Sequence, residues 1–163
     1  MSRIYIGIDN GVTGTIGVAG DDIQPSLYHT PTKKEQDYTR AKKMVTRLDC
    51  HGFMEILNQY DHNNIVCVIE RPMINPTRFN ASMSAIRCLE AQLIILEALG
   101  ISHQFTDSQK WQKMLLPEGT KGADEQKKAS KYIGNRMFPQ FGDFKHPDRD
   151  GLLIAEYARR CRL

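Results

Sequence analysis

The sequence lacks closely spaced cysteines, and its four cysteines are too far apart to suggest a zinc site or a disulfide framework. Cys50, Cys67, Cys88 and Cys161 include no CxxC pair, the spacing that zinc sites and redox motifs commonly use. Cys67 and Cys88 fall within apolar patterns, so we expect both to be buried as small hydrophobic residues.

Long apolar runs are also lacking. No stretch of the 163 residues approaches the roughly 20 apolar residues that span a bilayer. The N-terminal residues Met1–Ile4 lead directly into a strand pattern, without the apolar core of a secretory leader. We therefore expect a cytoplasmic protein that does not associate with membranes, and the length fits a single domain over residues 1–163.

A strong charge of either sign is absent as well, because the formal net charge is only +3. The distribution of charge is more informative. Residues 33–47 carry six basic side chains against two acidic ones, and a second basic cluster covers residues 121–136. Such clusters occur on solvated surfaces and on surfaces that bind the phosphate backbone of nucleic acids, and charge alone leaves both interpretations open.

Hydrophobic periodicity predicts a chain with five strands and several helices. The apolar run at 63–70 has the pattern of a central strand buried on both faces. A long helix is expected over 82–99, and the basic segment after Pro31 is expected to be a loop or a short mobile segment. The other predicted elements are strands at 3–9, 15–18, 23–28 and 101–107 and helices at 51–60, 108–115, 123–137 and 150–163. Their order predicts an α/β fold whose mixed sheet has an antiparallel start and parallel additions.

Two of the predicted central strands end in an acidic residue, Asp9 and Glu70, and two further acids, Asp148 and Asp150, open the last predicted helix. Strand ends at one edge of a sheet lie within side-chain reach, and a helix packed over that edge can bring more carboxylates there. Carboxylates a few ångströms apart raise one another's pKa. A divalent cation relieves that repulsion, and Mg²⁺ prefers such oxygen ligands together with water and substrate phosphates. A lone strand-end Asp is more often a cap or an ion-pair partner, so the prediction depends on the combination.

The stretches "GIDNGVTG", "VIERP", "KKAS" and "DGLLIAEY", in this order, resemble the RuvC family of Holliday-junction resolvases, and the phage and viral branch in particular. The resemblance runs from Ile4 to Tyr157. It implies a ribonuclease H-like fold, that is, a mixed five-stranded sheet flanked by helices. It also implies that Asp9, Glu70 and Asp150 are metal ligands, and, for a chain of phage or viral origin, that the protein works in the host cytoplasm.

The chain departs from the family pattern at two positions. Asn10 follows the first acid where the family often has proline, which we expect to be harmless. Cellular members place a fourth ligand three residues before the last acid, and Pro147 stands there. Helical spacing favours His146 as the substitute ligand, whereas the preference of Mg²⁺ for oxygen favours Asp148. Because Pro147 is expected at the start of the helix, Asp148 can lie in its first turn, and we favour Asp148.

The family also uses lysines near the scissile phosphate, where they steady the negative charge that develops on its oxygens. The segment 108–115 offers Lys110 and Lys113, and the segment 125–130 offers Lys127 and Lys128. The best matches are Lys113 and Lys127, with Lys110 a close competitor. Most of the basic residues would otherwise be ordinary surface lysines.

The resemblance further implies contacts with DNA and with a second copy of the chain. Met73, Ile74 and Phe79 follow Glu70 and could wedge between bases or simply pack beneath a loop. The apolar residues of the helix from Ser82 cover more than one face, which suits a homodimer. The basic residues expected to hold the arms of a junction are Lys33, Lys34, Arg40, Lys42, Lys43 and Arg47, with Lys110 as a further DNA contact.

The function predicted from these features is a metal-dependent endonuclease that resolves four-way junctions or other branched DNA by paired nicks. Two Mg²⁺ or Mn²⁺ ions per site would be held by Asp9, Glu70, Asp148 and Asp150, and the family implies products with a 5′-phosphate. Two alternatives stay open. "GIDNGVTGT" partly fits the phosphate-binding hairpin of actin-like and sugar-kinase folds, which need two such domains and about twice this length. A non-catalytic protein that binds branched DNA could use the same scaffold.

Overall fold

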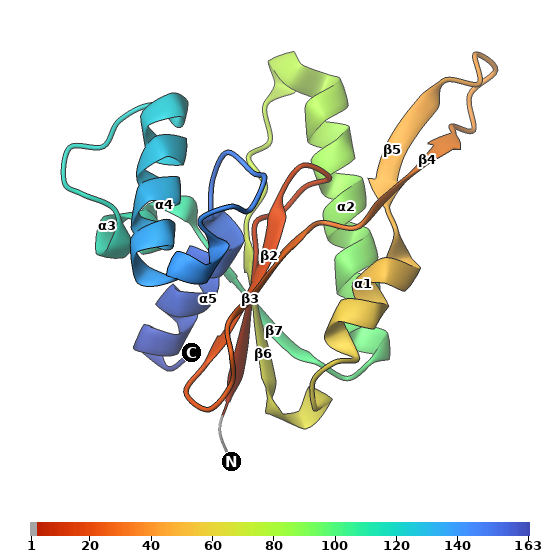
Figure 1. Cartoon of the computed structure of the whole chain (residues 1–163). Coiled ribbons are helices and arrows are strands. Elements are labelled where there is room, and N and C mark those ends of the chain that lie inside the picture. The colour runs from red at the N-terminus through yellow and green to blue at the C-terminus, as the bar shows by residue number, and fades with distance from the viewer. Residues whose placement is uncertain (1–2) are drawn as a thin grey trace.

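A computed structural model describes residues 3–163 and has at its centre a five-stranded sheet in the order β3-β2-β1-β6-β7 (Figure 1). The strands are β1 (Ile4–Ile8), β2 (Thr15–Gly20), β3 (Ser26–His29), β6 (Ile65–Glu70) and β7 (Ser102–Thr106). β1 and β2 pair antiparallel, as do β2 and β3, whereas β1 with β6 and β6 with β7 pair parallel. The predicted mixed sheet, with an antiparallel start and parallel additions, is confirmed.

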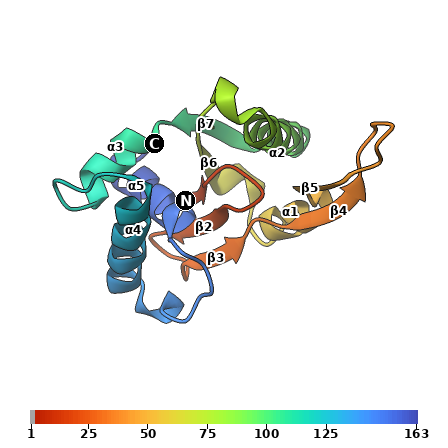
Figure 2. The ribbon, with the colours of Figure 1, turned by 90° about the horizontal axis from the view of Figure 1, so that it is seen from above.

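Helices cover both faces of the sheet, as the view from above shows (Figure 2). They are α1 (Cys50–Leu57), α2 (Phe79–Ala98), α3 (Ser108–Leu115), α4 (Ala123–Met137) and α5 (Asp150–Cys161). α1 and α2 lie on one face, and α5 lies on the other with α3 and α4 packed against it. Short 3-10 turns cover His62–Asn64, Pro76–Arg78 and Pro139–Phe141.

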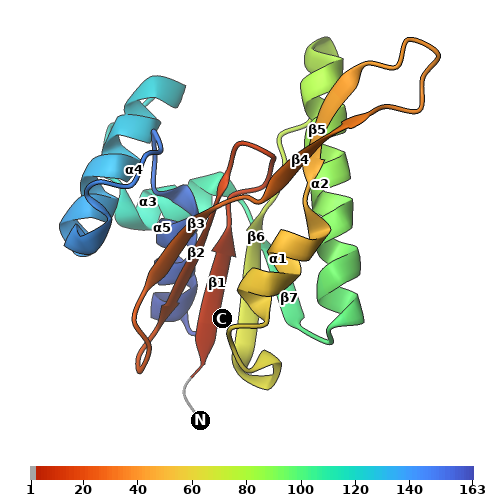
Figure 3. The ribbon, with the colours of Figure 1, turned by 45° about the vertical axis from the view of Figure 1, so that its right-hand side comes forward.

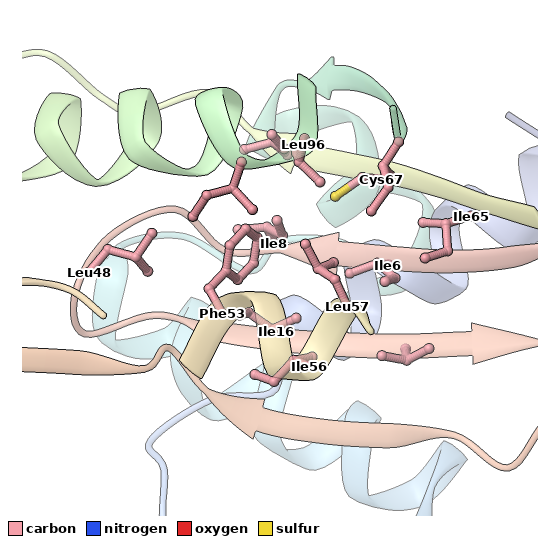
Figure 4. Close-up of a cluster of buried hydrophobic side chains, with 14 of the residues drawn as sticks. Ile6, Ile8, Ile16, Leu48, Phe53, Ile56, Leu57, Ile65, Cys67 and Leu96 are labelled. Atoms are coloured by element: carbon pink, nitrogen blue, oxygen red, sulfur yellow. The ribbon is translucent and has the colours of Figure 1, made fainter. Parts of the chain in front are cut away.

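The alternation of side chains along the central strands divides the core between these two faces. Ile6 and Ile8 of β1 face the α1–α2 side, where they pack with Phe53 and Leu96 (Figure 4). The predicted burial of Cys67 and Cys88 is confirmed, since both belong to this cluster. The opposite cluster contains Tyr5, Val68, Trp111, Leu115, Leu116, Leu153, Ile154 and Ala158.

Three glycines allow α5 to lie directly against the β1–β2 hairpin. A Cβ at Gly7 would collide with the backbone of Gly151 and Ala155, and a Cβ at Gly17 would collide with the backbone of Leu152. A Cβ at Gly151 would in turn lie 2.5 Å from the Thr15 carbonyl oxygen. This close contact brings the first turn of α5, which begins at Asp150, beside the end of β1.

The basic segment after Pro31 is not the expected loop but a second, two-stranded sheet of β4 (Thr32–Gln36) and β5 (Met44–Leu48). Lys33 lies opposite Arg47, and like charges in that position repel. Glu35 bridges both, at 2.6 Å from Lys33 Nζ and 2.7 Å from an Arg47 guanidinium nitrogen. These strands are held by ion pairs and not by alternating apolar side chains, so the sequence has no hydrophobic pattern that identifies them. The hairpin projects from the body beside the N-terminal end of α2 (Figure 3).

Several predicted bounds also shift. The long helix begins at Phe79 rather than Ser82, and the first helix of the chain ends at Leu57 rather than residue 60. The third strand covers Ser26–His29 instead of 23–28. Within residues 3–163, no helix is both long and apolar enough to cross a membrane. Met1 and Ser2, which were predicted to lead into the first strand, lie outside the described residues.

Candidate metal centre

The parallel pairing of β1 and β6 places Asp9 and Glu70 side by side. Ile8 at the end of β1 is in register with Ile69 of β6, so Asp9, which follows β1, and Glu70, the last residue of β6, leave the same edge of the sheet. Their proximity is a direct result of two neighbouring parallel strands ending together.

The segment before α5 brings two more carboxylates to this edge. Asp9, Asp148 and Asp150 each offer a carboxylate oxygen, and these three oxygens lie within 4.8 Å of one another, close enough to share a cation. Asp148 was expected in the first turn of the helix, but α5 begins at Asp150, so Asp148 belongs to the preceding loop. Because the backbone at Asp148 is not helical, the side chains of Asp148 and Asp150 can both reach the carboxylate of Asp9 although the two residues are only two positions apart.

The pKa values of Asp9, Glu70 and Asp150 are raised, which shows that the cluster holds more negative charge than its surroundings neutralise. Burial raises the pKa of Asp9 well above its ordinary value, and Asp150, Glu70 and Asp148 raise it further, against the opposing charge of Lys127. Burial and then Asp148 raise the pKa of Asp150 to about 7. The pKa of Glu70 is also raised, first by burial. Because the charge of Glu70 raises the pKa of Asp9 and of Asp150, and the charge of Asp148 raises the pKa of Glu70, this residue belongs to the same electrostatic cluster as the three aspartates.

A divalent cation fits this donor set. The side chains supply only oxygen atoms, they are largely buried, and they repel one another in the absence of a counter-charge. Hard cations such as Mg²⁺ and Mn²⁺ take carboxylate oxygens, and their charge would lower the pKa values that burial raises.

His146, the alternative fourth ligand, lies next to the cluster. One of its ring nitrogens is 2.9 Å from the Thr13 carbonyl oxygen and the other is 3.2 Å from a carboxylate oxygen of Asp148. Asp148, the residue that the preference of Mg²⁺ for oxygen favours, is thus the one whose carboxylate lies beside those of Asp9 and Asp150. His146 is not part of this group and contacts the carboxylate of Asp148.

Two residues that the sequence did not identify hold the carboxylates in place. Trp111 of α3 donates from Nε1 to Glu70 at 2.5 Å, which lowers the pKa of Glu70 against the effect of burial. The Ser130 hydroxyl of α4 donates to Asp150 and accepts from the backbone N–H of Arg149 at 3.0 Å. An indole and a hydroxyl inside amphipathic helices look like core and surface residues in the sequence, so no local signal marks them.

Arg149, between the two aspartates, anchors the loop that carries them. Its guanidinium group is completely buried and donates five hydrogen bonds to four backbone carbonyls and one side chain. The acceptors are the carbonyls of Phe141, Phe144, His146 and Asp148 and the side-chain oxygen of Asn135, at 2.7–3.1 Å. Gly134 of α4 leaves room for this side chain, because a Cβ there would lie 2.5 Å from Arg149 Cβ. Arg149, between the two acids, is therefore a buried structural arginine that the sequence did not identify.

The candidate lysines differ in their distance from the acids. Lys127 of α4 acts electrostatically on both Asp9 and Asp150, which places it beside the cluster. Lys110 and Lys113 are exposed on α3. Lys113 lines a separate hollow of about 450 Å³ between α3 and the start of α4.

The residues expected to contact DNA lie on the surface around this edge. Lys33, Lys34 and Arg47 are on β4 and β5, and Arg40, Lys42 and Lys43 form the tip between them. Met73 is 85% exposed and Phe79 is 68% exposed. These fractions are too high for side chains packed beneath a loop, so that alternative is wrong for both.

Comparison with known proteins identifies the fold. No protein-family model matches the chain, and no curated protein matches it in sequence. The solved structures that are similar to it include Thermus thermophilus RuvC in complex with a Holliday junction substrate, and Thermus thermophilus RuvC. Each is 15% identical with a TM-score of 0.59, and the match covers 98% of this chain and 95% and 97% of the respective RuvC chains. The chain has a RuvC-like, ribonuclease H-like fold, as the resemblance in sequence implied.

Proposed function

We propose that the protein is a metal-dependent endodeoxyribonuclease that resolves Holliday junctions and other branched DNA by paired symmetric nicks. The observation that carries the proposal is the convergence of acids from three distant segments at one sheet edge. Asp9, Asp148 and Asp150 share a site within 4.8 Å, and Glu70 acts on the same charges. A fold needs no such unfavourable cluster for its own stability, since like charges brought together in a buried place cost free energy.

Each carboxylate has a role in this proposal. Asp9, Glu70, Asp148 and Asp150 would hold two Mg²⁺ or Mn²⁺ ions, which when bound activate water and stabilise the leaving oxygen in phosphodiester hydrolysis. Trp111 and Ser130 fix two of these carboxylates by hydrogen bonds. The products would carry a 5′-phosphate and a 3′-hydroxyl.

Lysines beside the acids would position the DNA. Lys127, whose charge already acts on Asp9 and Asp150, is suited to contact the oxygens of the scissile phosphate and to steady their charge. Lys113 is a second candidate for this role, and Lys110 would contact a flanking phosphate.

The DNA arms and a second copy of the chain would approach from the α2 side. The basic hairpin of β4 and β5 would bind phosphates of the arms, and Met73 and Phe79 would meet bases at the branch. Ile86 and Ile94 of α2 are 42% and 57% exposed, which suits a homodimer formed through this helix. Such a dimer would present two active sites to the two opposed strands of a junction. We also propose that residues 1–163 form a single nuclease domain that acts in the cytoplasm.

A cleavage assay tests the proposed function. The protein is incubated with an end-labelled four-way junction and Mg²⁺ or Mn²⁺, beside Asp9→Asn and a matched variant of an exposed acid, Asp22→Asn. We expect symmetric nicks from wild type and Asp22→Asn and none from Asp9→Asn. Junction binding without cleavage under either metal would instead identify a non-catalytic binding protein, and nucleotide turnover would identify the kinase-like alternative.

A further inference from the structure

A hollow of about 560 Å³ lies between the β4–β5 hairpin and the first turns of α2. The hairpin side is formed by Tyr38, Lys43 and Met44, and the helix side by Phe79 and Arg87. We call this hollow the hairpin groove. Its two walls come from elements that pack against each other, and both rise from the same end of the molecule (Figure 3).

The groove exposes apolar side chains that no other part of residues 3–163 covers. Tyr38 is 90% exposed, Met44 60% and Phe79 68%. An uncovered apolar surface of this kind, with polar residues around it, is typical of a binding site.

Two cations stand at the rim beside these apolar walls. Neither Lys43 nor Arg87 forms a salt bridge with any residue between Arg3 and Leu163. The acid at the rim, Asp37, is held by its neighbour Thr39, whose backbone N–H and hydroxyl both donate to it. Apolar walls with a cationic rim are complementary to a nucleotide, which joins a flat base to an anionic phosphate.

The groove is connected to the acidic cluster through the β1–β2 turn. Val12, which is one of its lining residues, is in this turn, three residues after Asp9. The side-chain amide of Asn10 donates to the Ala85 carbonyl at 3.3 Å and so connects this turn to α2. A DNA strand whose phosphate lies at Asp9 can therefore continue along the turn into the groove.

Resting on the proposed function, we propose that the hairpin groove binds one unstacked nucleotide at the branch point of the DNA. Its base lies against Tyr38, Met44 and Phe79, and its phosphate lies beside Lys43 and Arg87. Extruding a base costs least where stacking is already interrupted, as it is at a branch and not in a linear duplex. The groove thus makes the protein prefer branched DNA, whereas the basic face of the hairpin binds any phosphate backbone.

A binding experiment separates the groove from general DNA affinity. A fluorescent four-way junction and a linear duplex of the same sequence are titrated in Ca²⁺ with wild type, Tyr38→Ala and Tyr132→Ala. Tyr132 is a matched control because it is an aromatic side chain, 63% exposed, on α4 outside the groove. Loss of one stacking contact predicts about tenfold weaker junction binding by Tyr38→Ala. Its duplex binding and both affinities of Tyr132→Ala are expected to stay within about twofold of wild type.

Photocrosslinking locates the nucleotide directly. We expect 5-iodouracil at the branch point, but not the same base in the middle of an arm, to crosslink to the peptide over residues 36–47. An unchanged junction affinity for Tyr38→Ala, or an equal loss on junction and duplex, overturns the groove proposal. A wild-type dimer that becomes monomeric in Tyr38→Ala during sedimentation also overturns it, because the occupant is then a second copy of the chain. If wild type cuts junctions in any of these cases, the proposed function survives without the groove.

Discussion

Asp150 allows the most quantitative prediction, because its carboxyl group is buried beside other acids and its pKa is raised to about 7. In the unfolded chain the same group titrates near 3.8. Between these two values the folded protein binds a proton that the unfolded chain has released. The contribution of Asp150 to stability is therefore lost as the pH rises from about 4 to about 7.

The size of the loss follows from the shift. Roughly three pKa units at 1.36 kcal/mol each correspond to about 4 kcal/mol between pH 4 and pH 7. Because the hydrogen bond from Ser130 is already included in this shift, Asp150→Asn removes the whole cost. Without divalent metal, the variant should be equal to wild type within about 1 kcal/mol near pH 4 and more stable than wild type by roughly 3–4 kcal/mol at pH 7.

Urea denaturation in EDTA between pH 4 and pH 7 measures this difference, with the exposed Asp22→Asn as control. Adding Mg²⁺ at pH 7 should reduce this difference, because the ion stabilises wild type more than the variant, in which it has one ligand fewer. A difference that does not grow with pH, or an Asp150→Asn protein that is less stable than wild type at pH 7 in EDTA, would refute the account of the cluster.

Three further predictions concern residues around the cluster. Gly134→Ala forces a methyl group against Arg149, so it should destabilise the protein by about 1–3 kcal/mol and weaken Mn²⁺ binding in calorimetry. Trp111→Phe removes the hydrogen bond that lowers the pKa of Glu70, so the acidic limb of the pH–rate profile should move to higher pH. Lys127→Ala should lower the single-turnover cleavage rate about 100-fold, with partial rescue by Lys127→Arg.

Each of these predictions has its own control and its own contrary result. Lys131→Ala, an exposed change on the same helix as Gly134, should leave Mn²⁺ binding unchanged, and equal effects of the two would contradict the role of Arg149. If the pH–rate profile of Trp111→Phe is not shifted, the ionisation of Glu70 does not control the cleavage rate. If Lys113→Ala slows cleavage and Lys127→Ala does not, Lys113 is the residue that contacts the scissile phosphate.

The sheet and the acids at its edge were predictable because they depend on local patterns in the sequence, namely apolar runs that end in an acidic residue. Continuous apolar runs ending in Asp9 and Glu70 identify two buried strands, and the parallel pairing of these strands in the structure brings their last side chains together. Asp148 and Asp150 were noticed as acids that open the last helix, and the resemblance singled out Asp150 as a metal ligand. Its approach to Asp9 depends on the close contact of α5 with β1 at Gly7 and Gly151.

The parts that the sequence did not reveal depend on tertiary contacts. The β4–β5 hairpin is stabilised by ion pairs of Glu35 with two cations. Its strands have no hydrophobic alternation from which they could have been predicted. Arg149 looks like a solvated charge between two acids, yet its acceptors are carbonyls that only the folded loop gathers around it. Ser130 is twenty residues from the carboxylate it contacts, and helical spacing does not connect positions so far apart.

The central claim is that acids from three distant segments hold divalent metal together. A crystal soaked in Mn²⁺, with diffraction recorded at the manganese absorption edge, measures this directly. We expect two anomalous peaks among the carboxylates of Asp9, Glu70, Asp148 and Asp150, and none there in an Asp9→Asn crystal treated in the same way. Peaks elsewhere on the protein with none at this cluster, in crystals that bind Mn²⁺, would contradict the claim.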